Sequence, residues 1–169
     1  MLSHGSLWYN VGVLKTINTS LYDFATFRDP EANCVYVDKT AQLYEICKPS
    51  ADRIYYLPRP RRFGKSLMIS TLKYLFLGRR DLFKGLAIDS MDWNWEKEVY
   101  PVLHLDMSQI AAADDLQMCV KLQNLLKGKC HDFGLEFDES IPPSSNFMNL
   151  LRGLARISPN GRYVVLVDE

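Results

Sequence analysis

R-P-R-R-F-G-K-S, from Arg59 to Ser66, is the stretch on which the interpretation of the fold depends. It ends in Gly-Lys-Ser, as a phosphate-binding loop does, but arginine stands where such a loop has its first glycine. Gly-Lys-Ser alone is a weak signal, because ordinary residue frequencies produce it by chance in on the order of one in ten chains of this length. The stretch is therefore either a nucleotide site with an altered entrance or a basic surface loop.

The flanking sequence favours a nucleotide site. Ile54–Leu57 is a short β-type run directly before the loop, and a helical pattern of apolar residues follows from Lys65 to Leu77. Gly78 stands where a glycine after a helix is expected. A strand, a loop and a helix in this order bring free backbone N–H groups and a helix N-terminus together, which is an arrangement that binds anions.

Each residue of the loop then has an expected role. Pro60 lacks an N–H group, so the phosphate cradle would begin at about Arg61. Lys65 would reach the β- and γ-phosphates and assist catalysis, and the Ser66 hydroxyl would bind Mg²⁺. Arg61 or Arg62 would add charge-assisted hydrogen bonds, or would equally pair with acids of a partner. The nucleotide-binding residues are thus expected to be Arg61, Arg62, Phe63, Gly64, Lys65, Ser66 and Leu67.

An acidic strand end supplies the second half of such a site. Val164–Val167 is apolar and is followed directly by Asp168 and Glu169. Asp168 would hold Mg²⁺, directly or through water, and Glu169 would accept a proton from the attacking water as a catalytic base. The two halves together are far more specific than either alone.

The composition is that of a globular protein with one domain. The chain has 169 residues, of which 47% are hydrophobic and 24% are charged. Its 20 basic and 20 acidic residues cancel, so the net charge points to neither nucleic acid nor a membrane. Basic residues nevertheless crowd between Arg53 and Lys65 without an intervening acid. This segment supports a second hypothesis, in which Arg59–Arg62 bind nucleic acid or a partner protein.

Targeting and cysteine signals favour an intracellular, cytoplasmic protein. The first ten residues lack a basic start followed by an apolar run, and the longest apolar run, Tyr163–Val167, is too short to span a membrane. The cysteines have no C-x-x-C spacing, so we expect free thiols in a reducing compartment. They are Cys34, Cys47, Cys119 and Cys130.

Strand-like and helix-like segments alternate along the chain, which predicts an α/β fold. The remaining predicted strands are 34–37, 101–106 and 163–167. Helices are predicted after Asp38, which could be an N-cap, from Asp114 onward and after Pro143. Because the strands are nearly all apolar, we expect a parallel sheet that is buried on both faces.

Several other residues allow two interpretations. Asp38–Thr40 would cap a helix, or would contact the base or ribose of a nucleotide. His104 and Asp106 share one face of a predicted strand and would form a core or strand-end hydrogen bond, although Asp106 could also belong to the site at the strand's carboxyl end. Trp93 and Trp95 would cover the edge of the core, with base stacking as the alternative.

A set of stretches carries a family resemblance. R-P-R-R-F-G-K-S is preceded by V-Y-V-D-K-T at Val35–Thr40 and followed by L-F-K-G-L-A-I at Leu82–Ile88. With Pro101–Ser108 and the strand that ends in Asp168-Glu169, these stretches resemble the predicted AAA-ATPase, or AAA-ATPase-like, family. The resemblance covers residues 23–169, whereas residues 1–22 match poorly and Pro58 is unusual before the loop.

The resemblance implies an ATP- and Mg²⁺-dependent P-loop NTPase. Its fold would have a mainly parallel sheet with flanking helices, Arg59–Ser66 as Walker A and Asp168-Glu169 as Walker B. Such proteins often carry a nuclease-like domain further along a longer chain, which would add a nucleic-acid partner. ATP rather than GTP rests on the resemblance alone.

The chain stops at Glu169, directly after the Walker B strand. In proteins that resemble this family, a later strand with a polar residue lies between the Walker B strand and the strand before the P-loop. We therefore expect residues 23–169 to be an incomplete domain that is not a competent ATPase by itself.

Overall fold

The computed structural model describes residues 22–48, 56, 58, 60, 63–110 and 114–168. Within these residues the strands are β1 (Val102–Asp106) and β2 (Val164–Asp168). The α-helices are α1 (Phe24–Arg28), α2 (Thr40–Cys47), α3 (Lys65–Phe76), α4 (Arg80–Phe83), α5 (Asp115–Asp132) and α6 (Pro143–Ile157). Short 3₁₀ helices are η1 (Pro30–Ala32), η2 (Ala87–Ser90) and η3 (Met107–Ile110).

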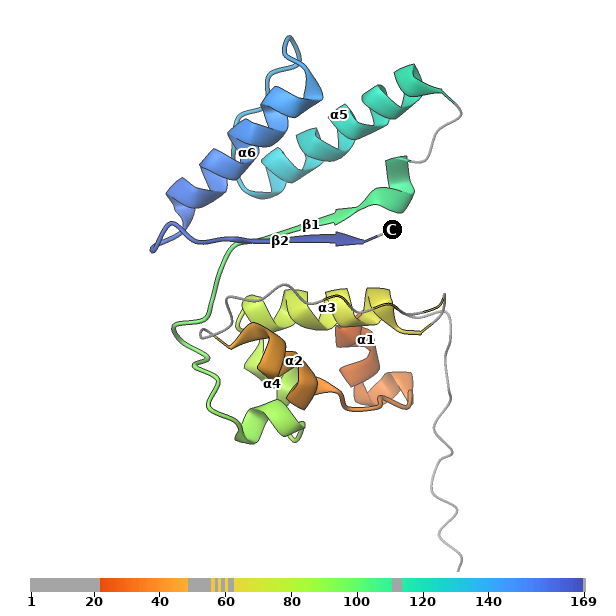
Figure 1. Ribbon diagram of the computed structural model, residues 1–169, viewed down its shortest axis with the longest axis vertical. Coiled ribbons are helices and arrows are strands. Elements are labelled where there is room, and N and C mark those ends of the chain that lie inside the picture. The colour runs from red at the N-terminus through yellow and green to blue at the C-terminus, as the bar shows by residue number, and fades with distance from the viewer. Residues whose placement is uncertain are drawn as a thin grey trace, which may run out of the picture.

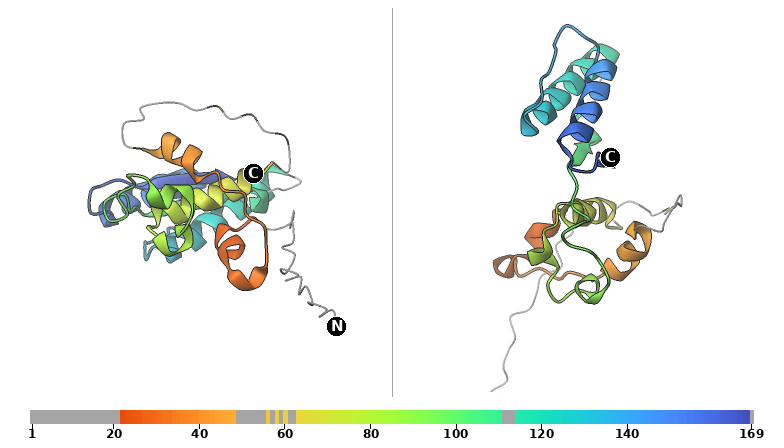
Figure 2. Two further views of the ribbon diagram at one scale, coloured as in Figure 1. Left: turned by 90° about the horizontal axis from the view of Figure 1, so that it is seen from below. Right: turned by 90° about the vertical axis from the view of Figure 1, so that its left-hand side faces the viewer.

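The two strands form a parallel pair that separates two layers of helices. β1 and β2 pair in register from Val102 with Val164 to Asp106 with Asp168. Helices α5 and α6 run in the same direction, connect the strands and lie on one side of the pair, while α3 lies on the other side with α1, α2 and α4 beyond it (Figure 1). The right-hand view of Figure 2 shows the same two layers from the side. The combination of helices with a parallel pair of strands agrees with the α/β fold predicted from the sequence.

The layer of α5 and α6 packs on β1 through an aliphatic cluster. This cluster consists of Leu103, Leu105, Leu126, Cys130, Leu150 and Leu154, which are all at most 6% exposed. Because side chains alternate along a strand, Val102, His104 and Asp106 lie on the other face of β1, toward α3.

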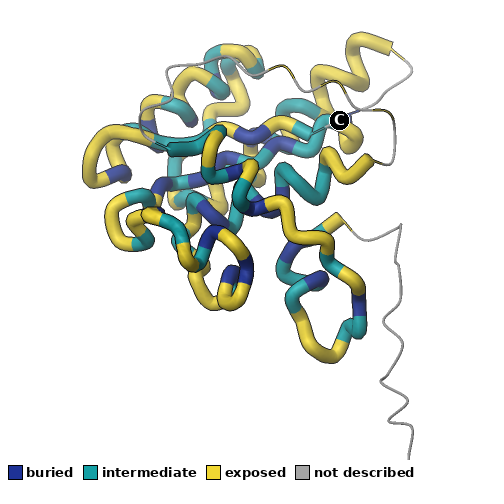
Figure 3. Tube along the Cα trace, turned by 60° about the horizontal axis from the view of Figure 1, so that its bottom comes forward, coloured by how far each residue is buried: buried dark blue, intermediate teal, exposed yellow. Residues whose placement is uncertain are grey.

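One expectation about the sheet is wrong. β2 is not buried on both faces, since Val165 is 37% exposed and Val167 is 51% exposed in the described part of the chain. Both residues are paired with β1 leucines of the aliphatic cluster, but α5 and α6 cover β1 more fully than β2. In Figure 3 the buried segments lie on the inner turns of the helices and on the strands.

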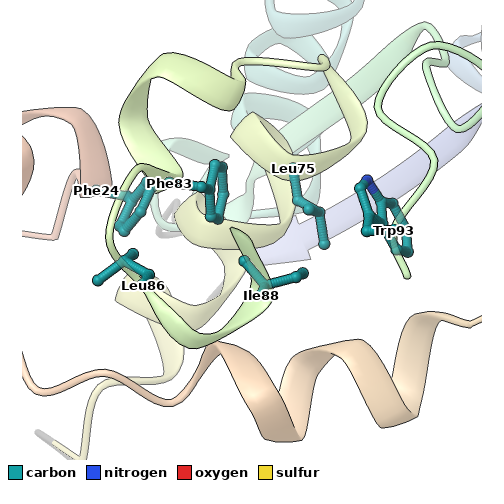
Figure 4. Close-up of a cluster of buried hydrophobic side chains, with 6 residues drawn as sticks. All are labelled: Phe24, Leu75, Phe83, Leu86, Ile88 and Trp93. Carbon is teal, nitrogen blue, oxygen red and sulfur yellow. The ribbon is translucent and has the colours of Figure 1, made fainter. Parts of the chain in front are cut away.

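The layer on the α3 side has an aromatic cluster as its core. It consists of Phe24, Leu75, Phe83, Leu86, Ile88 and Trp93, which come from α1, α3, α4, η2 and their connections (Figure 4). The Phe24 and Phe83 rings are 4.8 Å apart between centroids. Trp93 is 5% exposed and its ring meets Trp95 edge-on at 6.4 Å, so Trp93 belongs to the core, as the first interpretation predicts.

The predicted helix after the loop is confirmed as α3. It ends with Gly78 at φ 69°, where the Gly78 N–H donates to the Leu75 carbonyl and the Arg79 N–H donates to the Tyr74 carbonyl. These two bonds are a Schellman motif, which requires the left-handed backbone that glycine adopts readily. The predicted α5 and α6 are also confirmed, and the Asp114 side chain accepts from the Gln117 N–H at the start of α5.

Two predictions before the loop need correction. The run 34–37 is not a strand, because only Cys34 makes a β-bridge and Tyr36 instead packs its ring on Phe24 at 5.2 Å. The N-cap of α2 is Lys39 rather than Asp38. Asp38 lies one position before this N-cap. Its side chain accepts a hydrogen bond from the Thr40 N–H, so it still stabilises the start of the helix.

The predicted strand 54–57 lies outside the described residues except for Tyr56, and residues 1–21 lie outside them as well. The domain boundary at residue 23 and the incomplete P-loop domain stay predictions. None of the described helices is long and apolar enough to cross a membrane.

Candidate nucleotide-binding site

The N-terminus of α3 has the geometry of an anion site. Gly64 is the N-cap with φ 75°, and a Cβ at this position would meet open space, so the left-handed backbone rather than crowding favours glycine. The first backbone N–H groups of a helix have no partner inside the helix and carry its positive end. Lys65, Ser66 and Leu67 form this first turn, which leaves their N–H groups oriented for a phosphate.

Ser66 links the two halves of the predicted site. Its Oγ donates a hydrogen bond to Oδ1 of Asp168 at 3.1 Å, across 102 positions of the sequence. The bond joins the first turn of α3 to the carboxyl end of β2, where ligands of parallel sheets bind. The structure thus brings together the serine and the aspartate that the sequence assigns to one metal ion.

The pair fits the chemistry of Mg²⁺, which prefers hard oxygen ligands at about 2.0–2.1 Å in an octahedron, so that neighbouring ligands are about 3 Å apart. The hydroxyl can donate its proton to the carboxylate and still offer a lone pair. The described residues contain no group of three or more His, Cys, Asp or Glu side chains that could hold a metal by themselves. Such an ion would therefore need further oxygens from phosphates and water.

The other predicted loop residues divide into three groups. Lys65 and Phe63 are exposed, with Phe63 at 62%, so both side chains are accessible to a ligand. The Leu67 side chain packs against the aromatic cluster, which leaves only its backbone for a phosphate contact. The predictions for Arg61, Arg62 and Glu169 concern residues outside the described part of the chain.

A second carboxylate ends the neighbouring strand. Asp106 is in register with Asp168, and its carboxylate accepts from Ser108 and Gln109. The hydrogen bonds from Ser108, and then from Gln109, lower the pKa of Asp106 below its ordinary value. Burial, followed by the charge of Lys73, lowers the pKa of His104, whose Nε2 is buried and has no hydrogen-bond partner among the described residues.

Helix α1 holds α3 through a contact that the sequence reasoning missed. The Asp23 Oδ1 accepts from Ser70 Oγ at 3.1 Å, and the Ser70 Oγ accepts from the Phe24 N–H at 2.9 Å. Ser70 lies one turn after Ser66, so this contact fixes the helix that carries the site. The sequence did contain one signal for α1. Asp23 is a residue type that often caps helices, and its side chain accepts from the N–H of Thr26, three positions later.

The V-Y-V-D-K-T and L-F-K-G-L-A-I stretches bind each other. The Asp38 carboxylate accepts from the Thr40 hydroxyl at 2.7 Å and from the Ala87 N–H at 2.7 Å. The buried Thr40 Oγ1 accepts in turn from the Ile88 N–H at 3.1 Å. Asp38 and Thr40 therefore have a structural role in α2 and η2, although the N-cap of α2 is Lys39 and not Asp38 as predicted.

Comparison with known proteins identifies similar sequences. The sequence model of the family described as "Predicted AAA-ATPase" matches residues 19–169, a range that begins slightly before the expected residue 23. A protein of Azotobacter chroococcum mcd 1, described as "Uncharacterized protein in vnfD 5'region", is 32% identical over 155 residues. The matched part covers 92% of this chain and 29% of that protein, so the chain spans less than a third of its relative. No solved structure matches the chain.

Proposed function

Since the chain belongs to the predicted AAA-ATPase family, we propose that it binds ATP with Mg²⁺ at the N-terminus of α3. The observation that carries the proposal is the hydrogen bond of 3.1 Å between Ser66 and Asp168. A basic surface loop would not require an acidic strand end to meet the serine after its lysine. A Walker A and Walker B pair does require this contact.

Each residue has a distinct role in the proposal. The backbone from Arg61 to Ser66 and the Lys65 side chain bind the phosphates, and Arg61 and Arg62 add charge-assisted hydrogen bonds. Ser66 and Asp168 hold Mg²⁺, which would neutralise part of the phosphate charge when bound. Glu169 orients and deprotonates the water that attacks the γ-phosphate.

Hydrolysis belongs to the proposal for the whole protein. The matched part covers 29% of the relative's length, so we propose ATP hydrolysis, and any nuclease-like domain, for such a longer protein. A nucleic-acid partner is part of this wider proposal.

The binding of a labelled ATP analogue tests the proposal directly. In the purified protein with Mg²⁺, Lys65→Ala should weaken binding by at least about tenfold, because it removes a charge-assisted contact of about 1.5–3 kcal/mol. Lys73→Ala is a matched control, since Lys73 lies two turns further along the same helix. Equal affinities of the wild type and Lys65→Ala would contradict the proposal.

DNA binding at several salt concentrations tests the second hypothesis, in which the basic loop 59–62 binds nucleic acid or a protein. Binding through this loop should need no nucleotide and should weaken steeply with salt. Arg59, Arg61 and Arg62 lie outside the described residues, so this hypothesis stays a prediction from the sequence.

A further inference from the structure

Asp106 lies at the candidate site but belongs to neither of the two sequence motifs that predicted the site. It is the last residue of β1 and pairs in register with Asp168, the last residue of β2. Side chains at paired positions of parallel strands project from the same face, and neighbouring strands are about 4.8 Å apart. Asp106 is therefore beside Asp168 on the face where Ser66 donates to Asp168.

Within the described part of the chain, the hydrogen bonds of Asp106 leave one acceptor position. Its Oδ1 accepts from the Ser108 N–H at 3.1 Å and from Ser108 Oγ at 2.6 Å, and its Oδ2 accepts from Gln109 Nε2 at 3.0 Å. An ionised carboxylate has about four acceptor positions. The three bonds fix the orientation of the group and keep it ionised, and the fourth position, on Oδ2, can accept one more donor.

We propose that Asp106 is a positioning residue of the nucleotide site that accepts, through Oδ2, a hydrogen bond from a water molecule on the magnesium ion. The inference rests on the proposed function. Mg²⁺ in proteins usually keeps several waters, and partners outside the coordination sphere orient them. Asp106 thereby adds negative charge beside the ion and makes nucleotide binding more dependent on Mg²⁺.

The alternative is that Asp106 only stabilises the turn into η3, and the chain contains a control for its contacts with Ser108. Asp138 makes the same contacts with the serine two positions later, because its Oδ1 accepts from the Ser140 N–H at 2.8 Å and from Ser140 Oγ at 2.6 Å. Asp138 lies in the connection between α5 and α6, on the side of the strands opposite to α3 (Figure 1). Asp106→Asn and Asp138→Asn thus disturb equivalent turns, but only the first lies beside Asp168.

The experiment measures the affinity of the purified protein for a fluorescent ATP analogue with Mg²⁺ and with a chelator. The gain in affinity that Mg²⁺ provides should fall about tenfold in Asp106→Asn, as expected for an outer-sphere partner. Affinity in the chelator should not fall, because the variant removes a negative charge near the phosphates. Asp138→Asn should change neither value. An equal Mg²⁺ gain in the two variants would overturn the inference.

A measurement on the wild type covers the case in which Asp106→Asn does not fold. Mn²⁺ in place of Mg²⁺ should broaden the side-chain amide NMR signals of Gln109, which donates to Asp106, only when the nucleotide is present. Sharp Gln109 signals with bound Mn²⁺ and nucleotide would overturn the inference.

Failure of the proposed function and failure of the inference give different results. If the wild type binds no nucleotide under any condition, the proposed function itself fails. If it binds with an Mg²⁺ gain that Asp106→Asn retains, only the inference fails.

Discussion

The two helical layers on either side of the strands are held together in different ways. The aliphatic cluster joins β1 to α5 and α6 through leucines that recur along each helix. The aromatic cluster on the α3 side draws on four helical elements and two connections, and it is reinforced by hydrogen bonds between distant residues. Ser70 binds Asp23 across 47 positions, and Ala87 binds Asp38 across 49 positions.

The candidate site lies between these two layers. Ser66 belongs to α3, which contributes Leu75 to the aromatic cluster, whereas Asp168 ends a strand that pairs with β1 of the aliphatic layer. The bond between Ser66 and Asp168 therefore joins two separately packed units. We infer that the geometry of the site depends on both cores, although neither core contains Ser66 or Asp168.

The largest expected effects come from the same truncation in each core. Leu75 and Leu154 are both 0% exposed and belong to different clusters. Leu75→Ala and Leu154→Ala should each lower the free energy of unfolding by about 2–5 kcal/mol, through lost burial and the cavity left behind. Because the clusters share no residue, the effects in the double variant should add to within about 0.5 kcal/mol, as measured by urea denaturation.

Leu116→Ala is the control for this pair. Leu116 is 77% exposed on α5, so its truncation should change the stability by less than about 0.5 kcal/mol. A coupling well above 1 kcal/mol between the two buried positions would show one continuous core and would remove the contrast between the layers.

An intermediate effect is expected from the polar contacts of the aromatic layer. Thr40 is 0% exposed, and its hydroxyl both donates to Asp38 and accepts from the buried Ile88 N–H. Thr40→Val keeps the shape but leaves that N–H without an acceptor, which should cost about 1–3 kcal/mol in the free energy of unfolding. Ser90→Ala removes an exposed hydroxyl bond to Ala87 and should cost much less. Equal melting temperatures of Thr40→Val and the wild type would contradict this account.

The aliphatic layer and the strands could be predicted from the sequence, and so could the meeting of Ser66 with Asp168. Their signals are periodic and local, because helices α5 and α6 repeat apolar residues at spacings of three and four. The proximity of Ser66 and Asp168 followed from two motifs that a parallel sheet brings to one edge. The prediction erred at Val165 and Val167, since apolar residues alone do not determine how far a helical layer extends over a strand.

The aromatic layer could be predicted only in part. Helix α1 has five residues, too few for a periodic signal, and its position depends on Ser70 and on the ring of Tyr36. Residues 34–37 have strand-forming side chains, but the contact of Tyr36 with Phe24 outweighs that local preference. The role of Asp38 also depended on Ala87, which no pattern near Asp38 could reveal.

The smallest expected effect is a difference in acid sensitivity between Asp38, in the aromatic layer, and Asp138, in the α5–α6 connection. Burial alone would raise the pKa of Asp38, but the hydrogen bonds from Ala87 and Thr40 outweigh it and lower the pKa below 3.8. Hydrogen bonds from Ser140 likewise lower the pKa of Asp138. A carboxyl group with a lowered folded-state pKa stabilises the fold fully above its unfolded-state pKa, and this contribution is lost as the pH falls through the folded-state pKa.

The two carboxylates should nevertheless differ, because their partners differ in sequence distance. The bond from Ser140 to Asp138 spans two positions and can persist in the unfolded chain, whereas the bond from Ala87 to Asp38 spans 49 positions and cannot. We therefore expect the pKa of Asp38, and not that of Asp138, to be lower in the folded than in the unfolded state. In urea denaturation at about pH 7 and about pH 3, Asp38→Asn should reduce the loss of stability in acid relative to the wild type. Asp138→Asn should leave that loss nearly unchanged, and equal reductions in the two variants would mean that local turns contribute as much to acid stability as contacts between distant segments.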